Sequence, residues 1–254
     1  MLRLLLLLLR INWLNYRPAD CLPNACFCET VGNGLIRQPV NAYTNIGYVI
    51  VGILILVTLK KSRHKNLSKS IASGLTRNLL FLFGVAYIAV GIGSFLYHAS
   101  FIFLGEEMDD DSMYLIGMFM VLFEWARINK LSNKKFLTLY FSLNFIFELT
   151  IYFFPVVRGA LFAILIAISF IIEAEARKQT ALAEEIYFND LANMIFMAAY
   201  LIWILDKTHI LCYPDSLFQG HSIWHLLTAF AGWVMFKAMD CEYPSAVDSI
   251  PLSD

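Results

Sequence analysis

The sequence predicts an all-α, polytopic membrane protein: a bundle of seven transmembrane helices. Of its 254 residues, 59% are hydrophobic and 15% are charged, whereas soluble domains are ~45–50% apolar and ~25% charged. The mean hydropathy is +0.64. The apolar residues also gather into runs close to the ~20 residues that one helix needs to cross the hydrocarbon core of a bilayer. These observations exclude an ordinary soluble globular protein.

Seven apolar runs fit the length of a span. In chain order they cover about 40–60, 78–103, 112–126, 136–154, 156–173, 188–205 and 221–239. The first, third and fifth runs end where charged residues resume, and the second and fourth begin after basic residues.

Basic residues predict how the bundle is oriented. They gather in the loops after the first and third spans: Lys60, Lys61, Arg63, Lys65, Lys69, Arg77, Arg127, Lys130, Lys134 and Lys135. Loops rich in Lys and Arg stay in the cytoplasm, and the two spans between these loops return the chain to the same side. We therefore expect the N-terminus outside and the C-terminus in the cytoplasm. The acidic loop 105–111 and the loop 206–220 should both lie outside.

The chain divides into three predicted regions. Residues 1–39 form a targeting or interfacial segment and an outer-face region. Within them residues 2–9 are almost entirely leucine, a run too short to span a bilayer and not followed by a clear cleavage site. Residues 40–239 form the bundle, and residues 240–254 form a cytoplasmic tail. The 19 basic and 20 acidic residues nearly cancel, so no nucleic-acid partner is predicted.

Four of the five cysteines fall on the predicted outer side, namely Cys21, Cys26, Cys28 and Cys212, whereas Cys241 lies at the inner end of the last span. A disulfide between Cys212 and one of the three N-terminal cysteines is compatible with an oxidising outer compartment. Four unpaired thiols are the alternative. The sequence alone does not choose between these arrangements.

Three histidines reach the same leaflet of the predicted bundle. His98 lies near the outer end of the second span, and His221 and His225 open the seventh. Residues four apart share one face of a helix, and three protein ligands with an open fourth position are typical of catalytic zinc. No Glu follows His221, so this is not the soluble metalloprotease motif. Hydrogen-bonded core histidines are the alternative interpretation.

A serine and an aspartate complete the candidate site. Ser94 precedes His98 by one helical turn, so its hydroxyl could donate to an oxyanion or to a substrate carbonyl. A small residue for helix packing is the alternative. Asp109 is predicted to accept a proton from an attacking water. We expect the neighbouring Asp110 and Asp111 to cap the third span.

Three stretches occur in a recognisable order: Cys28-Glu29 with Gln38-Pro39-Val40-Asn41-Ala42-Tyr43-Thr44-Asn45, then Gly93-Ser94-Phe95-Leu96-Tyr97-His98 with Asp109 eleven residues later, then His221-Ser222-Ile223-Trp224-His225. Together they resemble the alkaline ceramidase family, part of a superfamily of seven-span membrane hydrolases that includes the adiponectin receptors. The resemblance extends from about residue 28 to residue 239. Each element is loose alone, but their order and their common leaflet are specific.

The resemblance implies a zinc-dependent amidase that cleaves the N-acyl bond of ceramide and releases a sphingoid base and a fatty acid. Carried over by motif, His98, His221 and His225 are the Zn²⁺ ligands. Asp109 orients or deprotonates the attacking water, and Ser94 stabilises the oxyanion. The reading from the residues themselves reaches these roles independently, but it does not select ceramide.

The N-terminal region departs from the family pattern. The resemblance implies that animal members of the family have a calcium site, built from an acidic, tryptophan-containing N-terminal segment. Here that region reads Cys26-Phe27-Cys28-Glu29, and Gln38 stands where a carboxylate is expected. The sequence therefore does not predict a complete Ca²⁺ site, although Glu29 and Asn41 remain candidate participants.

Three other functions are compatible with these residues. The first is another lipid hydrolase, acting on a phospholipid ester or a different acyl amide. The second is a receptor-like, non-catalytic member of the superfamily. The third is a transporter, which is disfavoured because the polar residues gather at one interface and no pair of broken helices is evident.

The predicted partners are a ceramide-like lipid substrate and the bilayer itself. The protein should be an integral, multi-pass membrane protein with its active site at the non-cytoplasmic face. That face borders the lumen of an endomembrane or a bacterial periplasm, and the sequence does not distinguish them. It indicates no oligomeric state.

Overall fold

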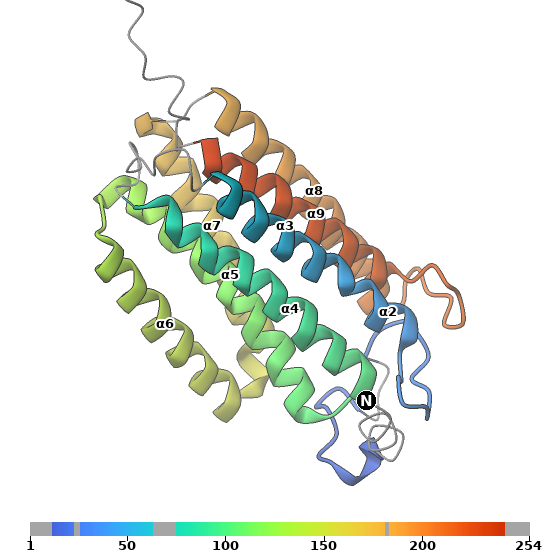
Figure 1. Ribbon diagram of the computed structural model, residues 1–254. Helices are drawn as coiled ribbons and strands as arrows, with labels where there is room; N and C mark the ends of the chain where they lie inside the picture. Colours follow the sequence, from blue (N-terminus) through green and yellow to red (C-terminus); the bar gives the residue numbers. More distant parts are fainter. Residues whose placement is uncertain (1–11, 23–25, 63–74, 181–182, 242–254) are drawn as a thin grey trace, which may run out of the picture.

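The computed structural model describes residues 12–22, 26–62, 75–180 and 183–241. All regular secondary structure in this part of the chain is helical, so the predicted all-α class is confirmed (Figure 1). The leucine run at 2–9, the basic residues Arg63, Lys65 and Lys69, and the tail from residue 242 onward lie outside the described residues.

Seven helices of the described chain, α3 to α9, form one bundle after a short leading helix, α2 (Figure 1). Their bounds are α2 Pro39–Thr44, α3 Ile46–Ser62, α4 Leu80–Ser100, α5 Phe103–Asn129, α6 Asn133–Phe153, α7 Arg158–Thr180, α8 Ala183–Lys207 and α9 Gly220–Cys241. Three short 3-10 turns accompany them, at Trp13–Asn15, Arg77–Leu79 and Pro155–Val157. The predicted first span is divided at Asn45, which ends α2.

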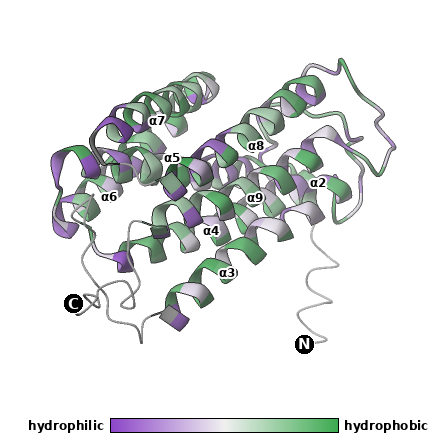
Figure 2. Ribbon diagram, turned by 90° about the horizontal axis from the view of Figure 1, so that it is seen from above, coloured by the Kyte–Doolittle hydropathy of each residue, from purple (hydrophilic) through white to green (hydrophobic). Residues whose placement is uncertain are grey.

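Within the described residues, five helical segments are long and apolar enough to cross a membrane. They are Pro39–Lys61, Arg77–Ser100, Asn133–Phe153, Pro155–Lys178 and Ala183–Lys207. Hydrophobic residues predominate along α3 and α7 (Figure 2). Large apolar side chains such as Phe145, Ile171 and Met194 are exposed on α6, α7 and α8, as expected of surfaces that face lipid. The remaining two helices, α5 and α9, carry Asp109, His221 and His225, whereas Ser94 and His98 lie on the apolar helix α4.

Helix packing places α4, α5 and α9 at the centre of the bundle. α4 packs on α3 and α5, α9 packs on α8 and α3, and α6 and α7 both pack on α5. The close approach of α4 to α5 depends on Gly93, because a Cβ there would collide with the backbone of Met108. Small residues permit such contacts between membrane helices. This contact brings the α5 backbone next to Ser94.

The third predicted span requires a correction. It was expected to begin near residue 112 after an acidic loop, with Asp110 and Asp111 as caps, but α5 already begins at Phe103. Both aspartates therefore lie inside a helix and do not cap it. The physical reason is a cation from α7: Arg158 pairs with Glu106 at 2.9 Å, Glu107 at 2.7 Å and Asp110 at 3.1 Å. Counter-charge from another helix offsets the repulsion along α5.

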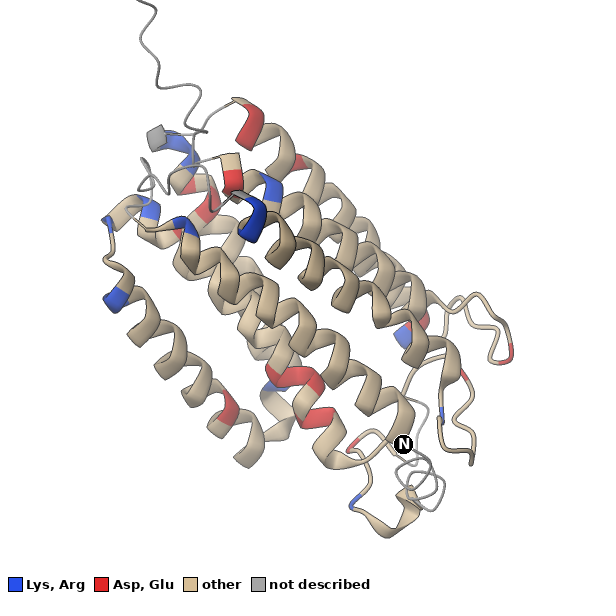
Figure 3. Ribbon diagram, in the orientation of Figure 1, with Lys and Arg blue, Asp and Glu red and all other residues tan. Residues whose placement is uncertain are grey.

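The two ends of the bundle differ in charge (Figure 3). The acidic residues of the first turns of α5 lie at one end, together with the three histidines; we call this the histidine end. At the opposite end, here the basic end, α3, α5 and α7 finish with basic residues in their last turns: Lys60, Lys61, Arg127, Arg177 and Lys178.

The described N-terminal segment crosses the histidine end and is tied to it by covalent and hydrogen bonds. The backbone of Ala19 pairs with that of Phe101 at 3.0 Å, and Phe103 pairs with Arg17 at 2.8 Å. Disulfides join Cys21 to Cys26 and Cys28 to Cys212. The pairing that the sequence left open is thus resolved in favour of Cys28 as the partner of Cys212.

Candidate metal and active site

The structure brings His98, His221 and His225 together inside the bundle. His98 lies in the last turn of α4, and the other two lie in the first turns of α9; their exposed fractions are 0%, 4% and 2%. One nitrogen of each ring lies within 4.8 Å of the others, and the Nε2 atoms of His98 and His221 are 3.0 Å apart. Two nitrogen ligands of tetrahedral zinc lie roughly 3.3 Å apart when Zn–N is ~2.0–2.1 Å. The spacing fits a transition-metal ion.

The hydrogen bonding of the cluster also fits a cation. Nδ1 of His221 is buried and has no hydrogen-bond partner among the described residues. The facing Nε2 atoms of His98 and His221 can share only one hydrogen between them. Hydrogen bonds alone therefore leave part of this cluster without a partner. A cation that accepts nitrogen lone pairs resolves the arrangement, whereas ordinary core histidines find partners for both nitrogens.

Local contacts explain why α9 presents His221 at this position. Asp206, at the end of α8, accepts a hydrogen bond from the backbone N–H of His221 at 3.0 Å and so satisfies a free donor of the first turn of α9. Its other oxygen accepts from the N–H of Cys28, also at 3.0 Å. The ring of Phe27 stacks on the His221 imidazole, with the centroids 3.7 Å apart.

Ser94 and Asp109 meet beside the histidines. Their exposed fractions are 2% and 9%, and the Ser94 hydroxyl lies close enough to the Asp109 carboxyl to interact with it. Both line a cavity of about 270 Å³, together with His221 and His225. His98 reaches the same place through its contact with His221. The sequence had predicted all five residues, and the structure gathers them at one position.

The cavity wall also carries charged residues, including Glu106, Asp110, Arg158 and Lys207. Lys207 donates to the backbone oxygen of Cys26 at 2.8 Å. The sequence analysis identified neither basic residue as part of the site. Each is an isolated basic residue at the outer end of a predicted span, which is the one signal that could have indicated them.

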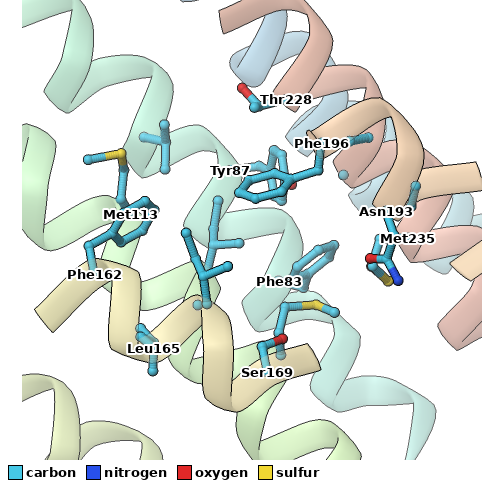
Figure 4. A pocket seen from close by; sticks show the side chains of 18 of the residues that line it. Phe83, Tyr87, Met113, Phe162, Leu165, Ser169, Asn193, Phe196, Thr228 and Met235 are labelled. Carbon is cyan, nitrogen blue, oxygen red and sulfur yellow. The ribbon is translucent and has the colours of Figure 1, made fainter. Parts of the chain in front are cut away.

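A second, apolar chamber adjoins this cavity. Its volume is about 140 Å³, and it shares with the first cavity the residues Tyr48, Val90, Met113, Phe162 and Trp224. Side chains of α4, α5, α7, α8 and α9 line it, and those that Figure 4 labels, such as Phe83 and Leu165, are mostly hydrocarbon. Polar catalytic-type groups and an apolar chamber therefore lie next to each other.

The region that departs from the family pattern has its own hydrogen bonds. The two carboxylate oxygens of Glu29 accept from the backbone N–H groups of Val40 and Asn41, each at 2.8 Å. Burial raises the pKa of Glu29, although these two bonds oppose the shift. Glu29 thus caps α2. The absence of a complete Ca²⁺ site stays a prediction.

Comparison with known proteins agrees with this geometry. The Ceramidase family model matches residues 27–246. The chain is also 24% identical to alkaline ceramidase 1 of Homo sapiens over 221 residues, which cover 82% of this chain and 79% of that protein. The family match spans most of the sequence and includes the three histidines, Ser94 and Asp109. The chain belongs to the ceramidase family.

Proposed function

We propose that the protein is a zinc-dependent ceramidase, which hydrolyses the N-acyl bond of ceramide to a sphingoid base and a fatty acid. The observation that carries the proposal is the convergence of three buried imidazoles with the Ser94–Asp109 pair on one cavity that adjoins an apolar chamber. Family membership supports ceramide as the substrate.

His98, His221 and His225 would hold the metal, because three neutral nitrogen donors match the ligand preference of zinc and leave a position open. When bound, Zn²⁺ supplies Lewis-acid chemistry: it acidifies water toward a pKa of ~7 and polarises a carbonyl oxygen. Burial of the imidazoles keeps bulk water away from this position.

Asp109 and Ser94 handle the proton and the developing charge. Asp109 takes a proton from the attacking water and later gives it to the nitrogen of the leaving amine. Once protonated, the carboxyl can donate to the Ser94 oxygen and no longer needs to accept from it. The hydroxyl hydrogen of Ser94 is then free to donate to the oxygen of the tetrahedral intermediate.

The apolar chamber suits one hydrocarbon chain of the substrate. Its lining on α9 extends from Trp224 to Met235, a distance of ~16 Å at a rise of 1.5 Å per residue. It lies deeper in the bundle than the histidines, so a chain inside it continues from the amide toward the middle of the bilayer. Burial of the apolar surface of that hydrocarbon chain contributes a favourable free energy of ~25 cal/mol per Å².

We further propose the full seven-span topology, with α5 and α9 crossing the bilayer beside the five apolar segments. The N-terminus then lies outside and the C-terminus in the cytoplasm, because the basic end of the bundle belongs on the cytoplasmic side. The active site accordingly lies near the non-cytoplasmic face.

The decisive experiment combines metal analysis of the detergent-purified protein with mass spectrometry of products from a mixed-lipid incubation. We expect about one zinc per chain and release of sphingoid base and fatty acid from ceramide. Turnover of phospholipid esters instead would identify another lipid hydrolase. Bound metal without turnover of any lipid would favour a receptor-like member of the superfamily.

A further inference from the structure

Two of the three imidazoles contact a polar side chain outside the cluster through Nδ1. Nδ1 of His98 lies 3.0 Å from Oε1 of Gln38. Nδ1 of His225 lies 3.0 Å from Oγ1 of Thr44. Gln38 immediately precedes α2 and Thr44 is its last residue, so one short helix contacts ligands on both α4 and α9.

The contacts of Gln38 determine which atom it offers to His98. Its Nε2 donates to the backbone oxygen of Glu29 at 2.5 Å, and its Oε1 also accepts from Nδ2 of Asn41 at 3.2 Å. Gln38 is completely buried. Because the atom that faces His98 is an acceptor, Nδ1 of His98 must carry the hydrogen. The lone pair of His98 is then on Nε2.

Thr44 acts on His225 in the same way. Its hydroxyl donates to the backbone oxygens of Val40 and Asn41, at 3.1 and 3.0 Å. The hydroxyl has one hydrogen, and both backbone oxygens can only accept it. With the hydrogen directed to either of them, Thr44 accepts from Nδ1 of His225, and the backbone oxygen of Asn41 is a further acceptor for that ring. The hydrogen of His225 is therefore on Nδ1, and its Nε2 is free to bind a metal.

Helix α2 itself is held between the two helices whose histidines it contacts. It packs against both α4 and α9, and the backbone N–H of Gln38 donates to the backbone oxygen of His98 at 3.0 Å. Glu29 caps its first turn, and Pro39 begins it, a residue suited to that position. The two acceptors are consequently fixed in space before any metal binds.

We propose that Gln38 and Thr44 are positioning residues that fix the tautomers and ring orientations of His98 and His225, so that both present Nε2 to one metal ion. This inference rests on the proposed function, since it assigns the three histidines to a metal. Loss of such an outer partner typically lowers metal affinity 10–100-fold.

The test uses substitutions that remove the acceptor but retain the volume, namely Gln38→Leu and Thr44→Val. We expect each to weaken Zn²⁺ binding 10–100-fold, measured by competition with a chromophoric chelator, and to change the visible spectrum of the Co²⁺-substituted protein. Thr44→Ser keeps the hydroxyl and should bind zinc like the wild type. Tyr43→Phe, on the exposed face of the same helix, is the matched control.

Gln38→Glu separates positioning from folding. It retains an oxygen toward His98 but loses the donor to the backbone of Glu29, so it should lower the melting temperature while it keeps most of the zinc affinity. If Gln38→Leu and Thr44→Val bind Zn²⁺ and Co²⁺ like the wild type, the two residues are merely structural and the proposal is wrong.

A metal-independent measurement distinguishes this proposal from failure of the proposed function. In metal-free protein labelled with ¹⁵N-histidine, NMR should show His98 and His225 as Nδ1–H tautomers, and Gln38→Leu and Thr44→Val should each disturb one of them. Absence of those tautomers in the wild type overturns the positioning role. A protein with these tautomers that binds zinc but cleaves no lipid contradicts only the proposed function.

Discussion

The two ends of the bundle bury ionisable groups in different ways. At the basic end, Arg127 is 1% exposed and pairs with Glu124 of its own helix and with Glu185 of α8, each 2% exposed. At the histidine end, Asp109 lies beside the Ser94 hydroxyl, and Nδ1 of His221 has no hydrogen-bond partner among the described residues. Burial is common to both ends. Arg158 pairs with carboxylates at the histidine end as well, so the difference lies in the candidate site itself, where a buried imidazole nitrogen is left for another ligand.

The largest effect is expected from removing a metal ligand. His221→Ala, or His98→Ala, should reduce ceramide hydrolysis to background and lower bound zinc well below one ion per chain, because two imidazoles hold Zn²⁺ far less tightly than three. Elemental analysis and product mass spectrometry measure both. A mutant that keeps its zinc and its activity would show that these histidines contribute to stability and not to metal binding.

The next largest effect separates metal binding from proton transfer. Asp109→Asn should keep zinc but lose turnover by ~10²–10⁴-fold, since an amide cannot accept the proton of the attacking water. Steady-state rates with metal content measured on the same sample provide the check. Asp111→Asn, two residues further along α5 and absent from the cavity lining, is the matched control and should retain its rate. Unchanged turnover in Asp109→Asn would place the base elsewhere.

A smaller loss is expected at Ser94. Ser94→Ala removes one donor to the oxyanion and should lower kcat by ~10²–10³-fold, with KM for ceramide and zinc content little changed. Ser100→Ala, which removes a hydroxyl bonded to the backbone oxygen of Leu96 on the same helix, serves as the control. If both substitutions changed kcat equally, Ser94 would be a packing residue and not an oxyanion donor.

The smallest effect on chemistry, and the clearest effect on stability, is expected at the basic end. Arg127→Met leaves two buried carboxylates without their cation, which costs about 3–5 kcal/mol, so thermal unfolding in detergent should shift downward. Replacing Glu124 and Glu185 by Leu in the same chain should recover most of that loss. Zinc content and turnover per folded molecule should not change. A specific loss of turnover would extend the functional region to both ends.

Much of the architecture follows from local sequence. Runs of ~20 apolar residues predict spanning helices, because in lipid the backbone N–H and C=O groups can hydrogen-bond only to each other. The spacing of His221 and His225 places them on one helical face without further knowledge. His98 was found because an ionisable group inside a span is costly and therefore informative, whereas Asp109, expected in the acidic loop before the third span, was selected as a proton acceptor.

What the sequence missed depends on partners that are distant in the chain. The acidic start of α5 looked like a loop because Arg158, which pairs with Glu107, stands 51 positions away. Thr44 and His225 are 181 positions apart, so neither contact leaves a local pattern. Gln38 was noticed only as a departure from the calcium pattern, whereas in the fold it contacts a histidine. Such contacts are set by packing, which composition and periodicity do not encode.

The Cys28–Cys212 disulfide, between residues 184 positions apart, implies an order of assembly. Phe27, Gln38 and Thr44 are synthesised first, but their counterparts His221 and His225 belong to the final helix. The candidate site is therefore incomplete until the last helix has been made. The Cys28–Cys212 bond can likewise close only after the α8–α9 loop has been synthesised, so it joins the earliest described part of the chain to one of the latest.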